Sequence, residues 1–480
     1  IELADLDDLS TTQIQALGSD VNALTTAQIQ ALTTAQVAAL TTAQIQALTN
    51  TQLAAMETAD VAKLTTDQIV ALTAAQIPAF GSAQIAALTT DHTAELSATQ
   101  IAALTSAQMP GISTAALALF DTTQLQAIED ADFAHLTPAQ IAALTTTQIP
   151  DLEQGQIGAM TSDQVAAIEL ADLAKFTVAQ MAYFGTAQIA ALTTAQVEAL
   201  STEQVDALTG TQLAALTTTQ IAKMETVDVA AIASTAVGSL TTAQMAALTT
   251  AQVAALTSDQ LSQLSTTQLV ALSPTQAGAM TTDQLPELSD SQLQALTTAQ
   301  WAAMNTTALA SLSSDQLGVL ETQDIAALKP AQITALTGTQ VLGLTSAQLG
   351  ALSTAQIVAL DSADVAVIDA AAIPGLTTAQ VAALTADQFD ALSSTQIGAM
   401  ENADVAAFTA SHMAALTSTQ ADGLTAGQLG AMTSAQFASM TTTTLASLTT
   451  TQLQGIEALD IGTLSNAHIA AIATDQISGL

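Results

Sequence analysis

Hydrophobic residues recur along this chain with a period of eight. From Leu24 onward every eighth residue is Leu, Ile, Met or Phe, and this frame holds to Leu480 without a slip. If these residues are numbered position 0, then position 5 is also apolar in 54 of the 57 octads. The frame is broken only before Leu24, because the interval from Leu17 to Leu24 is one residue short. A period kept this strictly indicates a repeat protein in which each octad is one structural unit.

The polar positions of the octad predict a short helix. Position 1 is nearly always Thr, Ser, Asp, Glu, Asn or Gly, and position 4 is Gln in 41 of the 57 octads. Thr at position 1 and Gln at position 4 form the capping box T-x-x-Q, in which each side chain bonds a free backbone N–H of the first helical turn. The apolar residues at positions 0 and 5 then occupy the two places of a hydrophobic staple. The octad pattern therefore predicts the start of a helix.

The prolines help to locate both ends of each helix. Three of them lie at position 2, the first helical position, where a missing N–H costs least: Pro138, Pro274 and Pro330. The other five lie at position 6: Pro78, Pro110, Pro150, Pro286 and Pro374. Because proline disfavours helical geometry in the residue before it, we expect the helix in these octads to end by about position 5.

Three other arrangements fit the period poorly. In one continuous helix the apolar row would drift by roughly 80° per octad, whereas coiled coils need repeats near 3.5 or 3.67 residues per turn. In a β-strand, positions 0 and 5 would point to opposite faces, and Ala and Gln are poor strand residues. Intrinsic disorder would not keep two apolar positions fixed over 57 octads. Short helices remain as the interpretation that agrees with every position.

We therefore predict an all-α fold, a solenoid of short capped helices with one helix per eight-residue repeat. One such helix is unstable alone, because nucleation is costly and few hydrogen bonds repay it. Stacked neighbours that share a continuous Leu and Ile core are stable together. We expect residues 1–480 to form a single solenoid domain, with a regular frame from residue 24 and a one-residue deletion between residues 17 and 24. Since the chain is in repeat phase at both of its ends, we expect it to be a piece of a longer protein.

Composition and charge narrow the possible partners. The chain carries 42 acidic residues against four Lys or Arg, a net charge of −38, and no Cys. Nucleic acid is excluded as a partner because binding to it depends on basic residues that neutralise phosphates.

Thr, Ser or Gln interrupts every apolar run, so we expect no membrane span. No Ser-His-Asp or Cys-His arrangement is present, so we expect neither an enzyme nor a small-molecule substrate. Divalent cations remain plausible ligands for so acidic a chain.

A second type of octad carries acidic residues at positions 1 and 4. The pairs are Glu2/Asp5, Glu57/Asp60, Glu129/Asp132, Glu169/Asp172, Glu225/Asp228, Glu321/Asp324, Asp361/Asp364, Glu401/Asp404 and Glu457/Asp460. Paired carboxylates with backbone oxygens suit calcium, which makes Glu57, Asp60, Glu169, Asp172, Glu401 and Asp404 candidate calcium ligands. Alternatively, acids in a first helical turn are favoured by the helix dipole, a structural role that we prefer. We expect no other cofactor. His92, His412 and His468 lie at position 4 and are expected to replace Gln in the cap.

Two resemblances to known families follow from the octad. The stretch from Leu32 to Leu40, which reads L-T-x-x-Q-V-x-A-L, resembles the first helix of a TAL-effector repeat, but the second helix and the base-reading loop are missing. The whole chain resembles the Thr-, Ala- and Gln-rich octapeptide tracts of giant bacterial surface proteins, including hemagglutinin-type adhesins. That resemblance implies a fibre or stalk, outside the cell or on its surface, that associates with itself or with other fibre components. The alternative is a binding solenoid, either a calcium-dependent adhesin or an ice-binding array of threonines.

Overall fold

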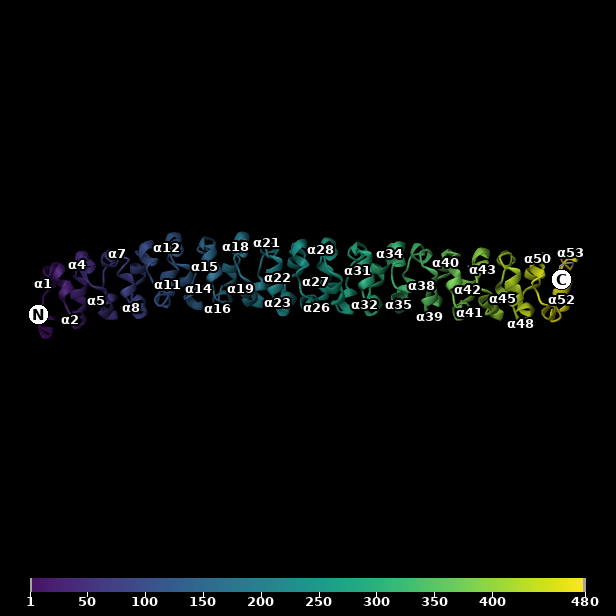
Figure 1. The fold of residues 1–480 in the computed structure, drawn as a ribbon, viewed down its shortest axis with the longest axis horizontal. Helices are drawn as coiled ribbons and strands as arrows, with labels where there is room; N and C mark the ends of the chain where they lie inside the picture. Colours follow the sequence, from purple (N-terminus) through teal and green to yellow (C-terminus); the bar gives the residue numbers. More distant parts are fainter. Residues whose placement is uncertain (1, 478–480) are drawn as a thin grey trace. The chain divides into compact units, whose positions relative to one another are not determined.

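The computed structural model describes residues 2–477, and every regular element in that range is helical. The contacts divide the chain into two compact units, Ile1–Ser239 and Leu240–Leu480, each of which is described by itself. Within each unit the helices follow one another in chain order along the unit (Figure 1). The predicted all-α fold with short helices is confirmed. The assignment of residues 1–480 to one solenoid domain stays a prediction.

The α-helices are four to six residues long. In the first unit they are α1 (Thr11–Ala16), α2 (Thr26–Gln30), α3 (Thr34–Ala38), α4 (Thr42–Ala47), α5 (Asn50–Ala55), α6 (Thr58–Val61), α7 (Thr66–Ala71), α8 (Ser82–Ala86), α9 (Thr90–Ala94), α10 (Ala98–Ile101), α11 (Thr114–Leu117), α12 (Thr122–Gln126), α13 (Asp130–Phe133), α14 (Pro138–Ile141), α15 (Gln154–Ala159), α16 (Ser162–Ala166), α17 (Leu170–Leu173), α18 (Val178–Met181), α19 (Thr186–Ala191), α20 (Thr194–Glu198), α21 (Thr202–Asp206), α22 (Gly210–Ala215), α23 (Thr218–Lys223), α24 (Thr226–Ala231) and α25 (Ser234–Val237).

The second unit has the same kind of helices. They are α26 (Thr242–Ala247), α27 (Thr250–Ala255), α28 (Ser258–Ser262), α29 (Thr266–Val270), α30 (Pro274–Ala277), α31 (Asp290–Ala295), α32 (Thr298–Ala303), α33 (Thr306–Ala310), α34 (Ser314–Gly318), α35 (Thr322–Ala327), α36 (Pro330–Thr334), α37 (Gly338–Leu342), α38 (Ser346–Ala351), α39 (Thr354–Ala359), α40 (Ser362–Val367), α41 (Thr378–Ala383), α42 (Ala386–Asp390), α43 (Ser394–Ala399), α44 (Asn402–Ala406), α45 (Ala410–Ala415), α46 (Ser418–Ala421), α47 (Ala426–Ala431), α48 (Ser434–Ser439), α49 (Thr442–Ser447), α50 (Thr450–Leu453), α51 (Ala458–Ile461), α52 (Asn466–Ala471) and α53 (Thr474–Ile477).

The octad forms its helix for the reason that the sequence predicts. In α5 the side chain of Thr49 accepts a hydrogen bond from the N–H of Gln52, and the Gln52 side chain accepts one from the N–H of Thr49. Leu48 and Thr49, at positions 0 and 1, are both extended, with ψ of 134° and 155°. Two extended residues in a row stop one helix and redirect the chain before the next helix begins.

Three octads make one turn of the solenoid. Within each unit, helices pack against the helix three places later, as α19 does with α22 and α20 with α23 in the first unit, and α44 does with α47 in the second. α20 begins at Thr194 and α23 at Thr218, so one turn takes 24 residues. Positions 0 and 5 face the shared interior: Val253 is fully buried and Leu256 is nearly so. Burial of both positions confirms the assignment of the core.

The octads with proline at position 6 differ from the prediction. Their helix does not end early; a turn and a 3₁₀-helix replace it. These helices are η3 (Ile77–Ala79), η4 (Met109–Gly111), η5 (Ile149–Asp151), η6 (Leu285–Glu287) and η7 (Ile373–Gly375). An α-helix needs the N–H of position 6, which proline lacks, so most backbone bonds in these octads have three-residue spacing. In η3 the N–H of Ala79 bonds the carbonyl of Gln76 at 3.1 Å.

The octad shortened by one residue also forms a 3₁₀-helix. η2 (Gly18–Ala23) fills the short interval before Leu24, and η1 (Leu3–Asp5) lies near the start of the chain. Leu17 is helical rather than extended, and Gly18 has a φ of 55°. This left-handed conformation favours glycine because a Cβ would clash there. The shortened octad thus turns the chain without the extended cap residue that the other octads use.

Candidate functional site

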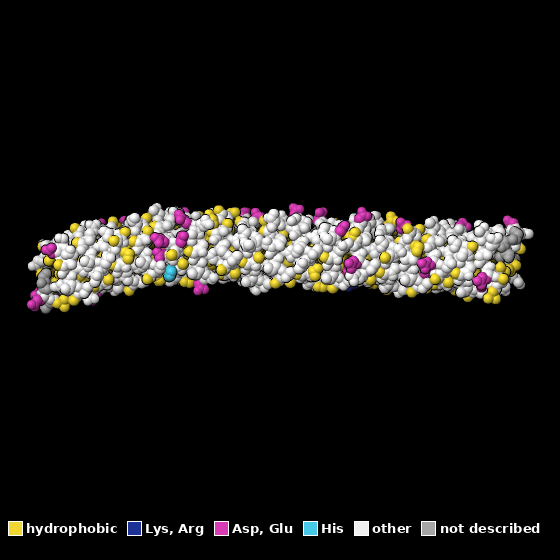
Figure 2. Space-filling view, in the orientation of Figure 1, with side chains coloured by type: hydrophobic (Ala, Val, Ile, Leu, Met, Phe, Trp, Pro, Cys, Tyr) yellow, Lys and Arg dark blue, Asp and Glu magenta, His cyan; other side chains and the backbone are white. Residues whose placement is uncertain are grey.

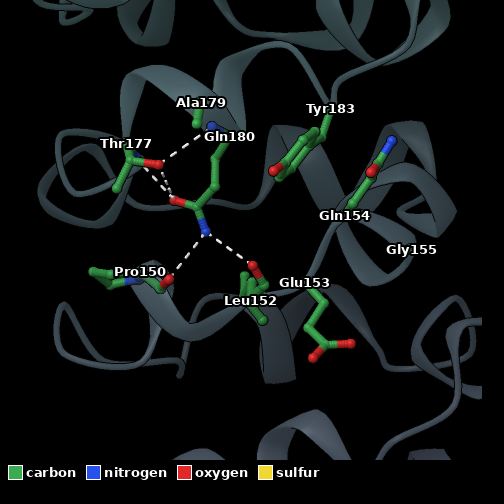
Figure 3. A pocket seen from close by; sticks show the side chains of 9 residues that line it. All are labelled: Pro150, Leu152, Glu153, Gln154, Gly155, Thr177, Ala179, Gln180 and Tyr183. Carbon is green, nitrogen blue, oxygen red and sulfur yellow. Dashed lines mark hydrogen bonds between the residues drawn. The ribbon is translucent and has the colours of Figure 1, made fainter.

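Within each unit, the Gln at position 4 joins a turn of the solenoid to the preceding turn. Gln180 is typical (Figure 3): its Oε1 accepts a hydrogen bond from the N–H of Thr177 at 2.9 Å. Its Nε2 donates to the carbonyls of Ile149 and Leu152, both at 3.0 Å. A primary amide offers one acceptor and two donors, and here all three are used. One buried side chain therefore caps its own helix and also binds the main chain of the preceding turn.

This bonding recurs at the same spacing along both units. The Nε2 of Gln164 donates to the carbonyls of Phe133 and Leu136, 31 and 28 residues earlier. The Nε2 of Gln396 does the same with Val365 and Ile368. We call this series of amides the glutamine ladder. It satisfies carbonyls at the ends of short helices, groups that would otherwise be buried without partners.

The capping role of this Gln was predicted from the sequence, but the ladder was not. Glu serves in a capping box as well as Gln does. Position 4 nevertheless contains no Glu in any of the 57 octads, although the chain is rich in acids. That absence is the signal that a side chain of this length needs the amide N–H groups at this position and not only the oxygen.

Two of the three histidines at position 4, His92 and His412, replace Gln in the cap as the sequence predicts, whereas the Nδ1 atom of His468 is buried without a hydrogen-bond partner. Nδ1 of His412 accepts a hydrogen bond from the N–H of Thr409 at 3.3 Å, and Nε2 lies 2.9 Å from the carbonyl of Leu384. The neutral imidazole with its proton on Nε2 satisfies both partners. The ring also stacks on Phe389, with centroids 4.6 Å apart. His412 is therefore a structural substitute for Gln.

The acidic octads place their two carboxylates differently. The Asp residues at position 4, among them Asp60, Asp172 and Asp404, are buried like the Gln that they replace. The Glu residues at position 1, Glu57, Glu169 and Glu401, are exposed and make no side-chain capping bond. The structure brings the two members of each pair together. It leaves the three pairs in separate octads.

Burial raises the pKa of these aspartates. For Asp60 desolvation is the main cause, followed by repulsion from Glu57, and the pKa rises to about 6. Desolvation and then Glu169 likewise raise the pKa of Asp172. For Asp404 desolvation again raises the pKa, and a backbone hydrogen bond from Glu401 partly opposes it. A carboxylate at this position lacks the two N–H donors that the amide of Gln supplies.

Two of the aspartates obtain a donor from the preceding turn. The Ser106 hydroxyl donates to Asp132 at 2.5 Å, and the Ser434 hydroxyl donates to Asp460 at 2.5 Å. Both serines lie at position 2, 26 residues before the aspartate. In contrast, the Oδ2 atom of Asp404 is buried and has no hydrogen-bond partner. The acidic octads therefore fall into satisfied and unsatisfied members.

The groove in Figure 3 offers little chemistry beyond the ladder. It has a volume of about 500 Å³ and lies between the octads of Leu152 and Thr177. Its lining residues are Pro150, Leu152, Glu153, Gln154, Gly155, Thr177, Ala179, Gln180 and Tyr183. Gln180 is already engaged in the ladder, which leaves the Glu153 carboxylate and the Tyr183 hydroxyl as its ionisable groups. These residues do not form a nucleophile and base pair.

Figure 2 shows how charge is distributed over one face of the molecule. On the face shown in Figure 2, acidic side chains are scattered among polar and small apolar ones. Within residues 2–477, no three His, Asp or Glu side chains gather so that they would hold a metal ion. None of the described helices has the length and apolar character to span a bilayer.

Comparison with known proteins identifies the repeat. A family model described as the ALTTAQ repeat matches residues 19–50, 53–90, 125–167, 165–202, 190–218, 221–258, 253–290, 317–354, 357–394 and 397–434. Among curated proteins the search finds no match. The family segments cover more than half of the chain and lie in both units. The octads of the glutamine ladder are thus copies of a recognised repeat, and the chain belongs to the ALTTAQ repeat family.

Proposed function

We propose that this repeat protein is a structural element of a bacterial extracellular or cell-surface fibre or stalk. The observation that carries the proposal is the glutamine ladder. Its bonds join a side-chain amide to main-chain carbonyls, as between Gln396 and Val365. Such bonds do not depend on which side chains a neighbouring octad carries, so turns can be added without limit. Extension by identical units is what a spacer or fibre needs.

The surface chemistry supports the same proposal. A net charge of −38 keeps copies of the chain soluble and apart until a specific contact joins them. The resemblance to surface-protein tracts supports export and assembly with itself or with other fibre components. The proposal includes no catalytic activity and no small-molecule substrate. Ice binding finds no support, because the threonines at position 1, such as Thr49, are used as helix caps.

Localisation tests this proposal directly. Antibodies raised against the purified chain are applied to intact cells of the producing organism and visualised with gold by electron microscopy. We expect gold along surface fibres or in the extracellular material, and removal of the label when intact cells are treated with protease. Cells that lack the gene are the control. Label confined to the cytoplasm of sectioned cells, with none on intact cells, would contradict the proposal.

A further inference from the structure

Asp404 stands where the glutamine ladder requires two N–H donors. It occupies position 4 of its octad and is 2% exposed. Its Oδ2 has no hydrogen-bond partner, although a backbone hydrogen bond from Glu401 engages the carboxylate. A buried carboxylate oxygen without a partner is costly and rare in native proteins. Some group other than a side chain of this octad must therefore complete its environment.

The register of the ladder indicates which oxygens lie opposite Asp404. On either side of it, Gln396 donates to residues 31 and 28 places earlier, and Gln428 does the same with Ile397 and Met400, both at 2.8 Å. The same spacing assigns the carbonyls of Ile373 and Leu376 to Asp404. α44, which contains Asp404, packs against α41, which begins two residues after Leu376. Replacing the amide by a carboxylate thus makes this site entirely oxygen.

The shorter side chain also leaves room. Asp lacks one methylene of Gln, so its terminal oxygen stops about 1.5 Å short of the place that the amide nitrogen occupies in the other octads. In those octads the nitrogen lies 2.8 to 2.9 Å from both carbonyl oxygens. A cation with oxygen ligands at about 2.3–2.6 Å fits near that place and bridges the carboxylate and the carbonyls.

A second carboxylate is available to the same space. Glu401 is exposed, makes no capping bond with its side chain, and lies close enough to Asp404 to disfavour its ionised form. Two carboxylates and two carbonyls carry a formal charge of −2, which a divalent ion neutralises. Calcium accepts irregular sets of carboxylate, carbonyl and water oxygens, whereas magnesium demands a near-ideal octahedron.

We propose that the space between Asp404 Oδ2 and the carbonyl oxygens of Ile373 and Leu376 binds one calcium ion, with the Glu401 carboxylate as a further ligand and water completing the shell. The ion takes the place of the two amide N–H groups and joins α44 to the preceding turn. This site is independent of whether the chain belongs to a fibre. Calcium then serves as a cross-link within the second unit.

Thr378 provides the competing explanation. It lies 26 residues before Asp404, the place from which Ser106 and Ser434 donate to Asp132 and Asp460. If its hydroxyl satisfies Asp404 in solution, Thr378→Val will lower the melting temperature and the protein will not respond to calcium. If calcium occupies the site, Thr378→Val will leave the calcium response in place.

The test titrates the full chain with calcium chloride in an isothermal calorimeter at neutral pH, after a chelator has removed divalent ions. We expect Asp404→Asn to reduce the number of calcium ions bound by one. We expect Glu401→Gln, on the exposed face, to weaken binding at that site about tenfold. Calcium should also raise the melting temperature of the unmodified chain, because it binds only the folded state, and this rise should shrink in Asp404→Asn.

Asp460→Asn is the matched control, since Ser434 already bonds Asp460 and this variant should bind as many calcium ions as the unmodified chain. Circular dichroism verifies that each variant is folded. An unchanged number of bound ions in Asp404→Asn overturns the proposal. So does an equal loss in Asp460→Asn, or magnesium binding as tight as calcium binding.

Discussion

Two adjacent octads of the second unit, residues 392–399 and 400–407, have the same helix and different ladder positions. Both bury the residue at position 4, Gln396 in one and Asp404 in the other. Gln396 bonds its own cap and the carbonyls of Val365 and Ile368, whereas Asp404 keeps an unpartnered oxygen. Both octads form a helix that begins at position 2, α43 at Ser394 and α44 at Asn402. Local capping and the connection between turns are therefore separate properties of the octad.

The difference also shows how a repeat stack tolerates weak octads. Each octad is held by its apolar positions as well as by the ladder, and its neighbours share the same core. An octad without donors is thus kept in place by those around it. Such octads are the points at which stability should respond to substitution, to pH and to ions.

The largest expected effect comes from placing a carboxylate at position 0, which is apolar in every octad from Leu24 onward. Leu256, at position 0, is 3% exposed, and Leu256→Asp would bury an unpaired charge in the shared core. We expect a loss of several kcal/mol in the free energy of unfolding, more than Asp404 costs in its own octad. Chemical denaturation followed by circular dichroism measures it.

Ala251→Asp is the control for the added charge. Ala251 is exposed at position 3, where other octads naturally carry acids such as Asp163 and Asp259. This variant should change stability by no more than about 0.5 kcal/mol. Equal losses in the two variants would show that position 0 is not part of the core.

The next effect separates the cap from the ladder within one octad. Gln396→Glu keeps the oxygen that accepts from the N–H of Ser393 but removes both donors to Val365 and Ile368. We expect a loss of about 2–4 kcal/mol at neutral pH, from two hydrogen bonds and a buried carboxylate. Thermal and denaturant unfolding of the purified chain give the value.

Removal of the cap alone should cost less. Ser393→Ala deletes the hydroxyl that accepts from the N–H of Gln396 and leaves the ladder intact, for a loss of about 1 kcal/mol. If Gln396→Glu were no worse than Ser393→Ala, the ladder would contribute nothing to stability and Gln would be only a cap.

The reverse exchange should stabilise an acidic octad. Changing Glu225 to Thr and Asp228 to Gln restores the majority octad in the first unit, with the carbonyls of Val197 and Leu200 in register for the new amide. We expect a gain of about 2 kcal/mol at neutral pH, from a restored cap and two new hydrogen bonds. The midpoint of denaturant unfolding measures the gain.

The matched exchange uses Glu457 and Asp460. Because the Ser434 hydroxyl already donates to Asp460, the same two changes there should gain less. A gain at residues 457 and 460 as large as that at 225 and 228 would mean that the serine bond does not distinguish the two kinds of acidic octad.

The sequence predicts whatever lies within one octad. The cap of Thr49 on Gln52 joins residues three apart, and the core follows from a fixed period, so both are visible in the local pattern. The ladder joins residues 28 and 31 apart, and its partners depend on three octads per turn, which no single octad reveals. The same holds for Ser106 and Asp132, which meet only through the turn. The paired acids were visible as pairs, but the burial of one member and the exposure of the other were not.

The smallest expected effect is a change in the free energy of unfolding with pH. It arises in two octads whose buried aspartates, Asp228 and Asp324, gain or lose a proton. Desolvation, and then repulsion from Glu225 and Glu321, raise the pKa of Asp228 and Asp324 to about 6. Both carboxyls have pKa values near 3.8 when exposed. Between pH 4 and 6 the folded chain therefore binds more protons than the unfolded chain, and the free energy of unfolding falls as pH rises. Above about pH 6 both aspartates are ionised in the folded and in the unfolded chain, so the free energy of unfolding falls no further on their account. After discounting for solvent screening, we expect the free energy of unfolding to fall by about 1 kcal/mol per carboxyl.

The comparison with a double variant isolates these two groups from the many exposed acids. Changing Asp228 and Asp324 to Asn removes the titrating groups and leaves the remaining surface charge as it was. In the presence of a chelator, the melting temperatures of the unmodified chain and the double variant should differ little at pH 4. The variant should become the more stable of the two as pH rises to 7. A carboxylate stabilised by hydrogen bonds would act in the opposite direction, since its pKa would be lowered and its contribution would grow with pH. A gap in favour of the unmodified chain at pH 7 would therefore show that solvent or a neighbouring donor reaches these aspartates, and that their octads are as well satisfied as those built on Gln.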